Sequence, residues 1–250
     1  MIPAALRVNQ LTYGYRTPLF EPLTFCCQKG EIWAVLGRNG LGKSTLLDTL
    51  TGTLPALGGS IENNGGIGIV AQHSHLPFPY TVSDVVLMGR AQHVKLFAQP
   101  SPQDQKRAMQ ALEQLNIAYL ASSSFGSLSG GQQQLVMIAR ALVTECQTLL
   151  LDEPCSALDL ANQQVVLQLI SDLAHQQGCS ILFSTHDPLH ALQVASHTLL
   201  LLPEGKWRAG PTNSIVTEEN LFLAYGLTLR KLSVENYQTP FIAPLFSIRR

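Results

Sequence analysis

The sequence predicts an α/β fold with a largely parallel core sheet, because short apolar segments alternate with helical ones along most of the chain. A glycine-rich turn links one of these segments to the helix that follows it. From about Tyr80 to Leu142, helix signals follow one another without a clear strand, and we interpret this stretch as an inserted helical subdomain. We therefore predict one domain over residues 1–250, with an α/β core at 1–72 and 143–250 and the helical subdomain at 73–142.

The predicted strands are short apolar segments bounded by turn residues. They are Glu31–Leu36, Ile67–Val70, Leu149–Leu151, Ile181–Ser184 and Leu199–Leu202. The last of them leads through a Pro-Glu-Gly turn into a predicted hairpin, and the glycine-rich turn leads into a helix from about Gly42 to Thr51. Helix starts are marked by capping pairs and by prolines at the first helical position. These pairs are Thr81 with Asp84, Ser101 with Asp104, and Asp187 with Pro188.

The composition is that of a globular protein with few charges. The chain has 250 residues, of which 46% are hydrophobic and only 13% are charged, about half of the usual share of roughly 25%. This length suits one α/β domain with a large core. The net charge is −1 and nothing resembles the basic footprint of a nucleic-acid binder, so we expect no nucleic-acid partner.

Cysteine usage and hydropathy place the expected site of action on the cytosolic side of a membrane. The five cysteines are odd in number and lack C-x-x-C spacing, which fits small core residues in a reducing compartment. The N-terminus shows no apolar run of signal-peptide length. The longest apolar runs are far shorter than the ~20 residues that cross a bilayer. We expect the protein to act at a membrane through another chain.

A phosphate-binding motif follows the first core strand. The sequence GRNGLGKS matches G-x-x-x-x-G-K-[ST] in a strand–turn–helix context, where backbone N–H groups cradle phosphates. The predicted ATP-binding residues are Gly37, Arg38, Asn39, Gly40, Leu41, Gly42, Lys43, Ser44 and Thr45. Lys43 is expected to reach the β- and γ-phosphates, and the Ser44 hydroxyl to bind Mg²⁺. The alternative, a chance glycine-rich turn, is rare in this context.

Two acids end the apolar strand Leu149–Leu151. In P-loop ATPases, the acid at this position orders Mg²⁺, and a second acid after it can polarise the attacking water. Asp152 and Glu153 occupy these two positions. Taken alone, the pair fits turn residues or helix caps equally well, but together with the glycine-rich loop it indicates an ATPase.

The segment Leu128–Gln132, with the sequence LSGGQ, resembles the signature motif of ABC ATPases without a mismatch. Ser129 can cap the helix that starts at Gly130, which leaves backbone N–H groups available to an anion. Other motifs of the family match in the same order along the chain. They are Gln72 after a strand, like the Q-loop glutamine, Ser156–Asp159, like the D-loop, and His186 after a strand, like the switch histidine.

The resemblance covers about Val8 to Gly226, and it implies a P-loop NTPase fold of the ABC type with an N-terminal antiparallel β part. Tyr15 is similar in position to the aromatic residue that stacks on adenine. Tyr13, two residues away on what we expect to be the same strand face, is the alternative, and either tyrosine could instead be a core aromatic of the strand.

The family mechanism implies an ATP site shared by two copies arranged head to tail. Ser129, Gly130, Gly131 and Gln132 of one copy would close over the ATP that the Lys43 loop of the other copy holds. The resemblance assigns Mg²⁺ to Ser44 and Gln72, with Asp152 acting through water. It makes Glu153 the general base, His186 the residue that contacts the γ-phosphate, and Gln72 a further catalytic residue.

The stretch Pro77–Arg90 resembles importer ATPases for ferric siderophores, haem and vitamin B12. Within this class the chain is most similar to a molybdate or tungstate import ATPase, although no residue of the sequence reads the cargo. The implied partners are a second copy, a transmembrane permease dimer and, indirectly, a periplasmic or surface substrate-binding protein. The implied location is the cytoplasmic face of the inner membrane. The alternatives are a soluble ABC ATPase of iron–sulfur cluster assembly and a DNA-repair or chromosome ATPase, although the latter needs a coiled-coil or zinc insertion.

A docking surface for the permease is expected beside Gln72. We hypothesise that Leu76, Phe78 and Tyr80 border the groove that receives a permease helix, because exposed aromatics favour interfaces. The alternative is that these residues are an ordinary hydrophobic anchor of the helical subdomain.

Overall fold

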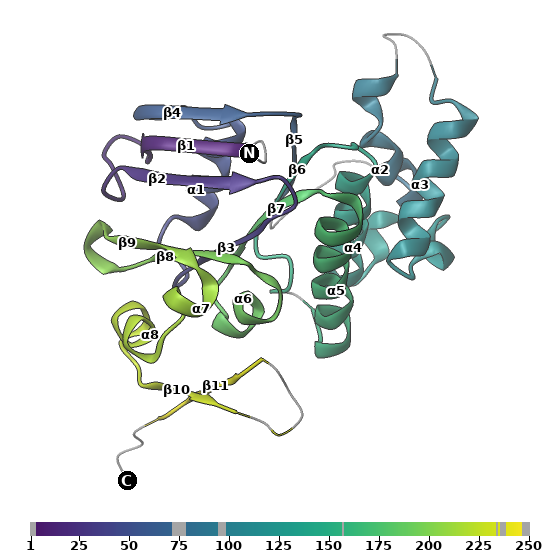
Figure 1. Ribbon diagram of the computed structural model, residues 1–250. Coiled ribbons are helices and arrows are strands. Elements are labelled where there is room, and N and C mark those ends of the chain that lie inside the picture. The colour runs from purple at the N-terminus through teal and green to yellow at the C-terminus, as the bar shows by residue number, and fades with distance from the viewer. Residues whose placement is uncertain are drawn as a thin grey trace.

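A six-stranded, mostly parallel sheet forms the centre of the molecule (Figure 1). The computed structural model describes residues 4–71, 79–94, 99–156, 158–233, 235 and 239–246. The strand order is β5 (Ile67–Val70), β6 (Thr148–Leu151), β7 (Ser180–Thr185), β3 (Ile32–Leu36), β8 (His197–Leu201) and β9 (Trp207–Pro211). Only the β8–β9 hairpin pairs antiparallel within this sheet. The α/β prediction and the hairpin after Leu202 are confirmed.

A separate antiparallel sheet covers one face of the central sheet. Its order is β2 (Leu23–Gln28), β1 (Ala4–Thr12) and β4 (Gly58–Asn63). Alternate residues of β3 point to opposite faces, so Trp33 and Val35 pack on this side together with Leu46 and Leu47 of α1 (Lys43–Thr51). This packing fixes α1 between the two sheets and confirms the N-terminal antiparallel β part.

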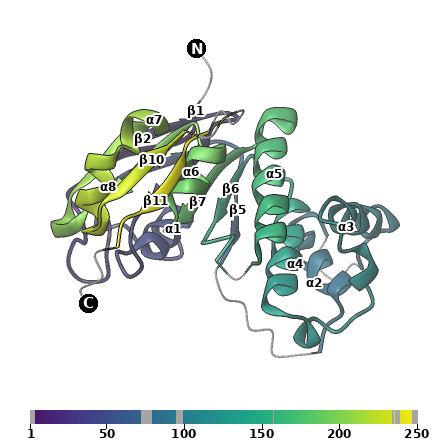
Figure 2. The same ribbon diagram turned by 90° about the horizontal axis from the view of Figure 1, so that it is seen from below.

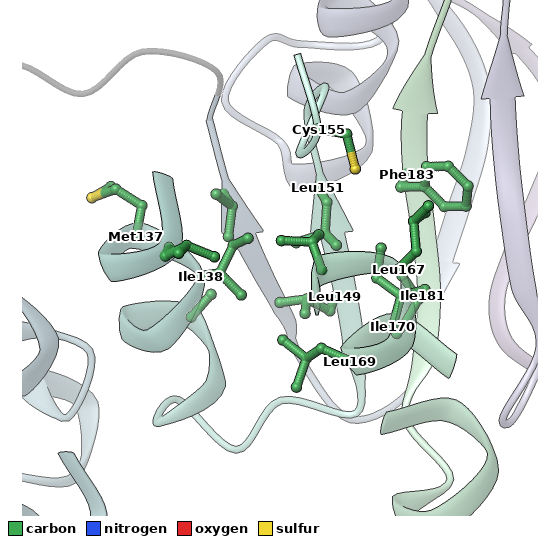
Figure 3. Close-up of a cluster of buried hydrophobic side chains, with 14 of the residues drawn as sticks. Met137, Ile138, Leu149, Leu151, Cys155, Leu167, Leu169, Ile170, Ile181 and Phe183 are labelled. Carbon is green, nitrogen blue, oxygen red and sulfur yellow. The ribbon is translucent and has the colours of Figure 1, made fainter. Parts of the chain in front are cut away.

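The other face of the central sheet is covered by helices. Ile32, Ala34 and Leu36 of β3 belong to a second hydrophobic cluster with α4 (Gly130–Leu142) and α5 (Leu160–Gln177). Figure 3 shows Leu149 and Leu151 of β6 between side chains of these two helices. The strand β6 is buried along its whole length, which explains why its sequence is a continuous apolar run.

The elements from Val82 to Leu142 that the structure describes are all helical. They are α2 (Val82–Met88), η1 (Ala91–His93), α3 (Pro102–Gln114), η2 (Ala118–Leu120), η3 (Phe125–Ser127) and α4. Both predicted capping boxes are present, at Thr81–Asp84 and Ser101–Asp104. The subdomain boundaries near residues 72 and 143 stay a prediction, because 72–78 lie outside the described residues.

Of the three residues expected to border the permease groove, the structure describes only Tyr80. The Tyr80 side chain is half-buried and packs against the large hydrophobic cluster. The backbone carbonyl oxygen of Tyr80 accepts a hydrogen bond from the Phe125 N–H at 2.9 Å. For Tyr80 these contacts favour the alternative, an anchor of the helical subdomain. Leu76 and Phe78 lie outside the described residues.

The C-terminal part packs at the end of the molecule opposite α2 and α3 (Figure 2). It comprises α6 (Pro188–Val194), which Asp187 caps, η4 (Pro203–Gly205), α7 (Thr212–Ile215), α8 (Glu218–Tyr225), and a hairpin of β10 (Leu229–Leu232) and β11 (Phe241–Pro244). The sequence left the tail after Arg230 unassigned.

Within the described ranges, no helix combines the length and apolar character that a membrane span requires.

A buried arginine joins three helices of the helical subdomain. Arg90 follows α2, and its Nε lies 2.9 Å from Oδ1 of Asp104 in α3. Its Nη1 donates to the Val143 carbonyl at 2.7 Å and lies 3.0 Å from Glu145 Oε2. Because a buried charge needs partners, this network fixes how α2, α3 and the end of α4 meet. Hydrogen bonds from Ser101, and next from Arg90, lower the pKa of Asp104 to about 2.

Replacing Asp104 with Asn should therefore lower stability in a pH-dependent way. The folded-state pKa of Asp104 lies below its unfolded value, so its contribution is present above about pH 4 and is lost as the pH falls toward 2. We expect Asp104→Asn to lower Tm by a few degrees at pH 6, with the gap from the wild type narrowing below pH 4. Glu113→Gln, an exposed change on the same helix, is the control. A gap that stays constant from pH 6 to 3 would contradict this assignment.

Candidate active site

The glycine-rich loop connects the carboxyl end of β3 to the amino end of α1. Gly40 and Gly42 have φ values of +80° and +88°, a region that favours glycine, and Gly42 is the N-cap of α1. A Cβ at Gly42 would lie 2.7 Å from Leu19 Cδ1. The residues 38–40 are exposed, so the positive end of the helix dipole and the loop face solvent, as an anion-binding site requires.

The side chain of Lys43 folds back into this loop. Its Nζ donates to the carbonyl oxygens of Gly37 at 2.9 Å and Arg38 at 3.2 Å, and lies 3.0 Å from Oε1 of Glu153. The side chains of Lys43 and Glu153 are only 4% and 9% exposed, so this ion pair is almost fully removed from water. The loop and the end of β6 thus form one site.

Glu153 stands in a constrained backbone position directly after β6. Its φ is +46°, which is uncommon for a residue other than glycine. Its second carboxylate oxygen, Oε2, lies 3.2 Å from Nδ1 of His186, an exposed residue at the carboxyl end of β7. The predicted pair of catalytic candidates is therefore in contact, and strained backbone of this kind is concentrated at functional sites.

Ser184 is a site residue that sequence reasoning treated only as the end of a strand. Its hydroxyl donates to Oδ1 of Asp152 at 2.6 Å and accepts from the N–H of Glu153 at 2.8 Å. Ser184 is completely buried in β7, which runs parallel to β6. The available signal was a serine directly after the apolar run Ile181–Phe183, because a hydroxyl that is buried at the end of such a strand needs partners.

Oxygen ligands suited to Mg²⁺ lie at the same edge. Ser44 is exposed in the first turn of α1, and Asp152 is 6% exposed at the end of β6. Burial, and next the charge of Asp152, raise the pKa of Asp48, one turn after Ser44. A hydroxyl and a carboxylate are oxygen ligands that fit a hard cation that also binds phosphate. In the described residues no group of three or more His, Cys, Asp or Glu could hold a metal by itself. Gln72 lies outside the described residues.

Tyr13 and Tyr15 do not lie on one strand face, so the expectation that they share such a face was wrong. β1 ends at Thr12, before both tyrosines, and Gly14, with φ +150°, begins a bend over residues 14–17. Tyr13 is fully buried and stacks on Phe20 with ring centroids 5.8 Å apart. Tyr15 is 74% exposed. Tyr13 is thus a core aromatic in the loop, while Tyr15 remains the candidate for stacking on adenine.

The signature motif begins α4, away from the loop that begins α1. Ser129 is the N-cap, and it forms a capping box in which its hydroxyl accepts from Gln132 N–H at 3.3 Å. Ser129 and Gly130 are exposed, and a Cβ at Gly130 would meet nothing within 4 Å. Asp159 of the D-loop caps α5, while Ala157 lies outside the described residues. The signature helix start therefore faces solvent.

Comparison with known proteins agrees with this geometry. The family profile described as "ABC transporter" matches residues 20–156, and the chain belongs to this family. It is an ATP-binding subunit of the kind whose members hydrolyse ATP to power transport. The fold is the ABC ATPase type of P-loop fold.

Individual relatives are similar over nearly the whole chain. The molybdate import ATP-binding protein MolC of Haemophilus influenzae is 47% identical, covering 97% of both chains. The ferric enterobactin transport ATP-binding protein FepC of Escherichia coli is 36% identical, covering 97% of this chain and 94% of its own. A solved structure of a metal-chelate type ABC transporter in an inward-facing conformation is 45% identical, covers 98% of both chains and has a TM-score of 0.91. None of these is described as an iron–sulfur assembly or DNA-repair ATPase.

The Ser184 bridge yields a test of stability. Ser184→Ala leaves a buried oxygen of Asp152 and the N–H of Glu153 without this partner, so we expect it to lower the free energy of unfolding by about 1–3 kcal/mol. The matched control is Thr148→Val. The Thr148 hydroxyl is also buried but has no hydrogen-bond partner in the described part of the chain, so its loss should be nearly neutral. Denaturant unfolding measures both, and equal losses would contradict the proposed bridge.

Proposed function

We propose that this chain powers an importer for molybdate or tungstate, or for a related metal chelate, through a transmembrane permease. The observation that carries the ATPase part is that Glu153 contacts both the buried Lys43 and the exposed His186 at the carboxyl ends of the parallel strands. Ligands of open α/β sheets bind at this edge. The cargo rests on the 47% identity with the molybdate import protein over almost the full length of both chains.

The chemistry assigned to the site is phosphoryl transfer to water. The loop N–H groups and Lys43 bind the β- and γ-phosphates, and Tyr15 stacks on adenine. Mg²⁺, held by Ser44 and Gln72 with Asp152 acting through water, would neutralise phosphate charge. Glu153 accepts the proton of the attacking water, and His186 hydrogen-bonds the γ-phosphate and positions that water. Catalysis of this kind depends on placement and charge stabilisation rather than on covalent chemistry.

A second copy of the chain completes the proposed site. The exposed helix start at Ser129–Gln132 offers backbone N–H groups to an anion but lies on α4, apart from the Lys43 loop on α1. Head-to-tail pairing would place these residues over the γ-phosphate bound by the other copy. ATP binding then closes the dimer and hydrolysis lets it open, which drives the permease at the cytoplasmic face of the inner membrane, with a substrate-binding protein supplying the cargo outside.

Glu153→Gln should separate ATP binding from hydrolysis. The amide keeps the shape of the side chain but cannot take a proton, so we expect kcat to fall by roughly 10²–10⁴ while ATP affinity changes little. Steady-state ATPase assays and nucleotide titrations measure the two quantities. Glu62→Gln, an exposed change in β4, is the control and should retain full activity. Hydrolysis near the wild-type rate would remove Glu153 from the role of base.

The cargo can be tested with the permease in liposomes. We expect ATP-dependent uptake of labelled molybdate or tungstate that is lost in the Lys43→Ala variant, because that variant lacks the phosphate-binding ammonium group. Ferric siderophore and haem serve as competing cargos. Uptake of a ferric chelate without any uptake of molybdate or tungstate would overturn the cargo proposal and leave the ATPase mechanism intact.

A further inference from the structure

The C-terminal segment from α8 to β11 packs against the main body close to the active site. Leu221, Ala224 and Leu229 are buried in the same hydrophobic cluster as Phe183 of β7 and Ala191 of α6. Figure 2 shows β10 and β11 running past α6, the helix that begins directly after His186. The segment is therefore anchored to the strand and helix that carry the switch histidine.

One side chain of this segment contacts the backbone of the active site. The hydroxyl of Tyr225, the last residue of α8, donates to the carbonyl oxygen of His186 at 2.8 Å. Burial, and next the negative charges of Asp187 and Glu153, raise the pKa of Tyr225. The phenol therefore remains a protonated donor at neutral pH.

The position of Tyr225 is itself fixed on both sides. Thr217 caps the start of α8, and Gly226, with φ +66°, ends the helix in the left-handed conformation. Glu218, the first residue of α8, also accepts a hydrogen bond at Oε1 from the backbone N–H of Lys231 at 2.8 Å, which ties α8 to β10. Helix α8 is therefore capped at its start and linked to β10, so the hydrogen bond of Tyr225 joins the His186 backbone to an element with its own anchors.

His186 is the more exposed member of the pair that it forms with Glu153. It lies in a bend between β7 and α6, is exposed, and reaches Glu153 through a single side-chain contact of 3.2 Å. Glu153, in contrast, is buried and is also held by Lys43. A hydrogen bond to the His186 carbonyl therefore adds a contact to the member of this pair whose side chain is less enclosed.

We propose that Tyr225 is a positioning residue for hydrolysis: its hydroxyl holds the backbone of His186 so that the imidazole meets Glu153 and the γ-phosphate. This inference rests on the proposed catalytic roles of His186 and Glu153. It makes the C-terminal segment, which lies beyond the part matched by the family profile, a determinant of the ATPase rate.

The test compares Tyr225→Phe with the wild type in the full-length chain. Loss of one hydrogen bond should lower kcat about two- to tenfold, with the KM for ATP unchanged. Tyr119→Phe removes an exposed hydroxyl in the helical subdomain and should change neither value. Thermal unfolding of each variant shows whether the fold is affected.

A double-mutant cycle with His186→Ala separates positioning from a structural role. Single-turnover assays with enzyme in excess make the slow rates of the His186→Ala variants measurable. If Tyr225 acts through His186, adding Tyr225→Phe to His186→Ala causes no further loss. An equal loss in both backgrounds, or no loss in the wild-type background, overturns the proposal. If His186→Ala alone hydrolyses ATP normally, the catalytic role proposed for His186 fails instead.

Discussion

The ion pair between Lys43 and Glu153 is the interaction on which the rest of the site depends. Both side chains are almost completely buried, and a buried charge is tolerated only when it is paired. Lys43 begins α1, Glu153 follows β6, and their contact ties the phosphate loop to the strand that carries both acids. The 3.0 Å separation places the ammonium group proposed to bind phosphate beside the carboxylate proposed as the base.

The fold supplies this arrangement through the direction of its strands. β3, β6 and β7 are parallel neighbours or next neighbours, so their carboxyl ends meet at one edge and present Gly37, Asp152 and His186 together. Ser184 ties the strand ends to one another, and the two hydrophobic clusters hold the sheet from both faces. The strands thus position the loop residues of the site, as they commonly do in α/β enzymes.

Most of the fold and the core of the site could be predicted, because they depend on local patterns. The glycine spacing, the two acids after an apolar strand and the capping pairs each act over a few residues, and the structure places them as expected. The family resemblance supplied what no local pattern could, namely the antiparallel sheet, which the structure confirms, and the role of Ser129 in a second copy, which stays a prediction. Local reasoning failed where a contact is long-range: Ser184 and Tyr225 gain their meaning only from partners 31 or more residues away. The orientation of Tyr13 and Tyr15 was missed because the strand ends at Thr12 and a bend follows, so strand alternation does not apply to them.

The central claim is that the charges of Lys43 and Glu153 stabilise one another within a single site, and a double-mutant cycle on stability tests it most directly. Lys43→Met, Glu153→Gln and the double variant would be unfolded by denaturant in nucleotide-free buffer. Each single change leaves a buried charge without its ion-pair partner, so the double variant should be more stable than the sum of the single losses predicts, with a coupling of about 1–3 kcal/mol. Strictly additive losses would contradict the account.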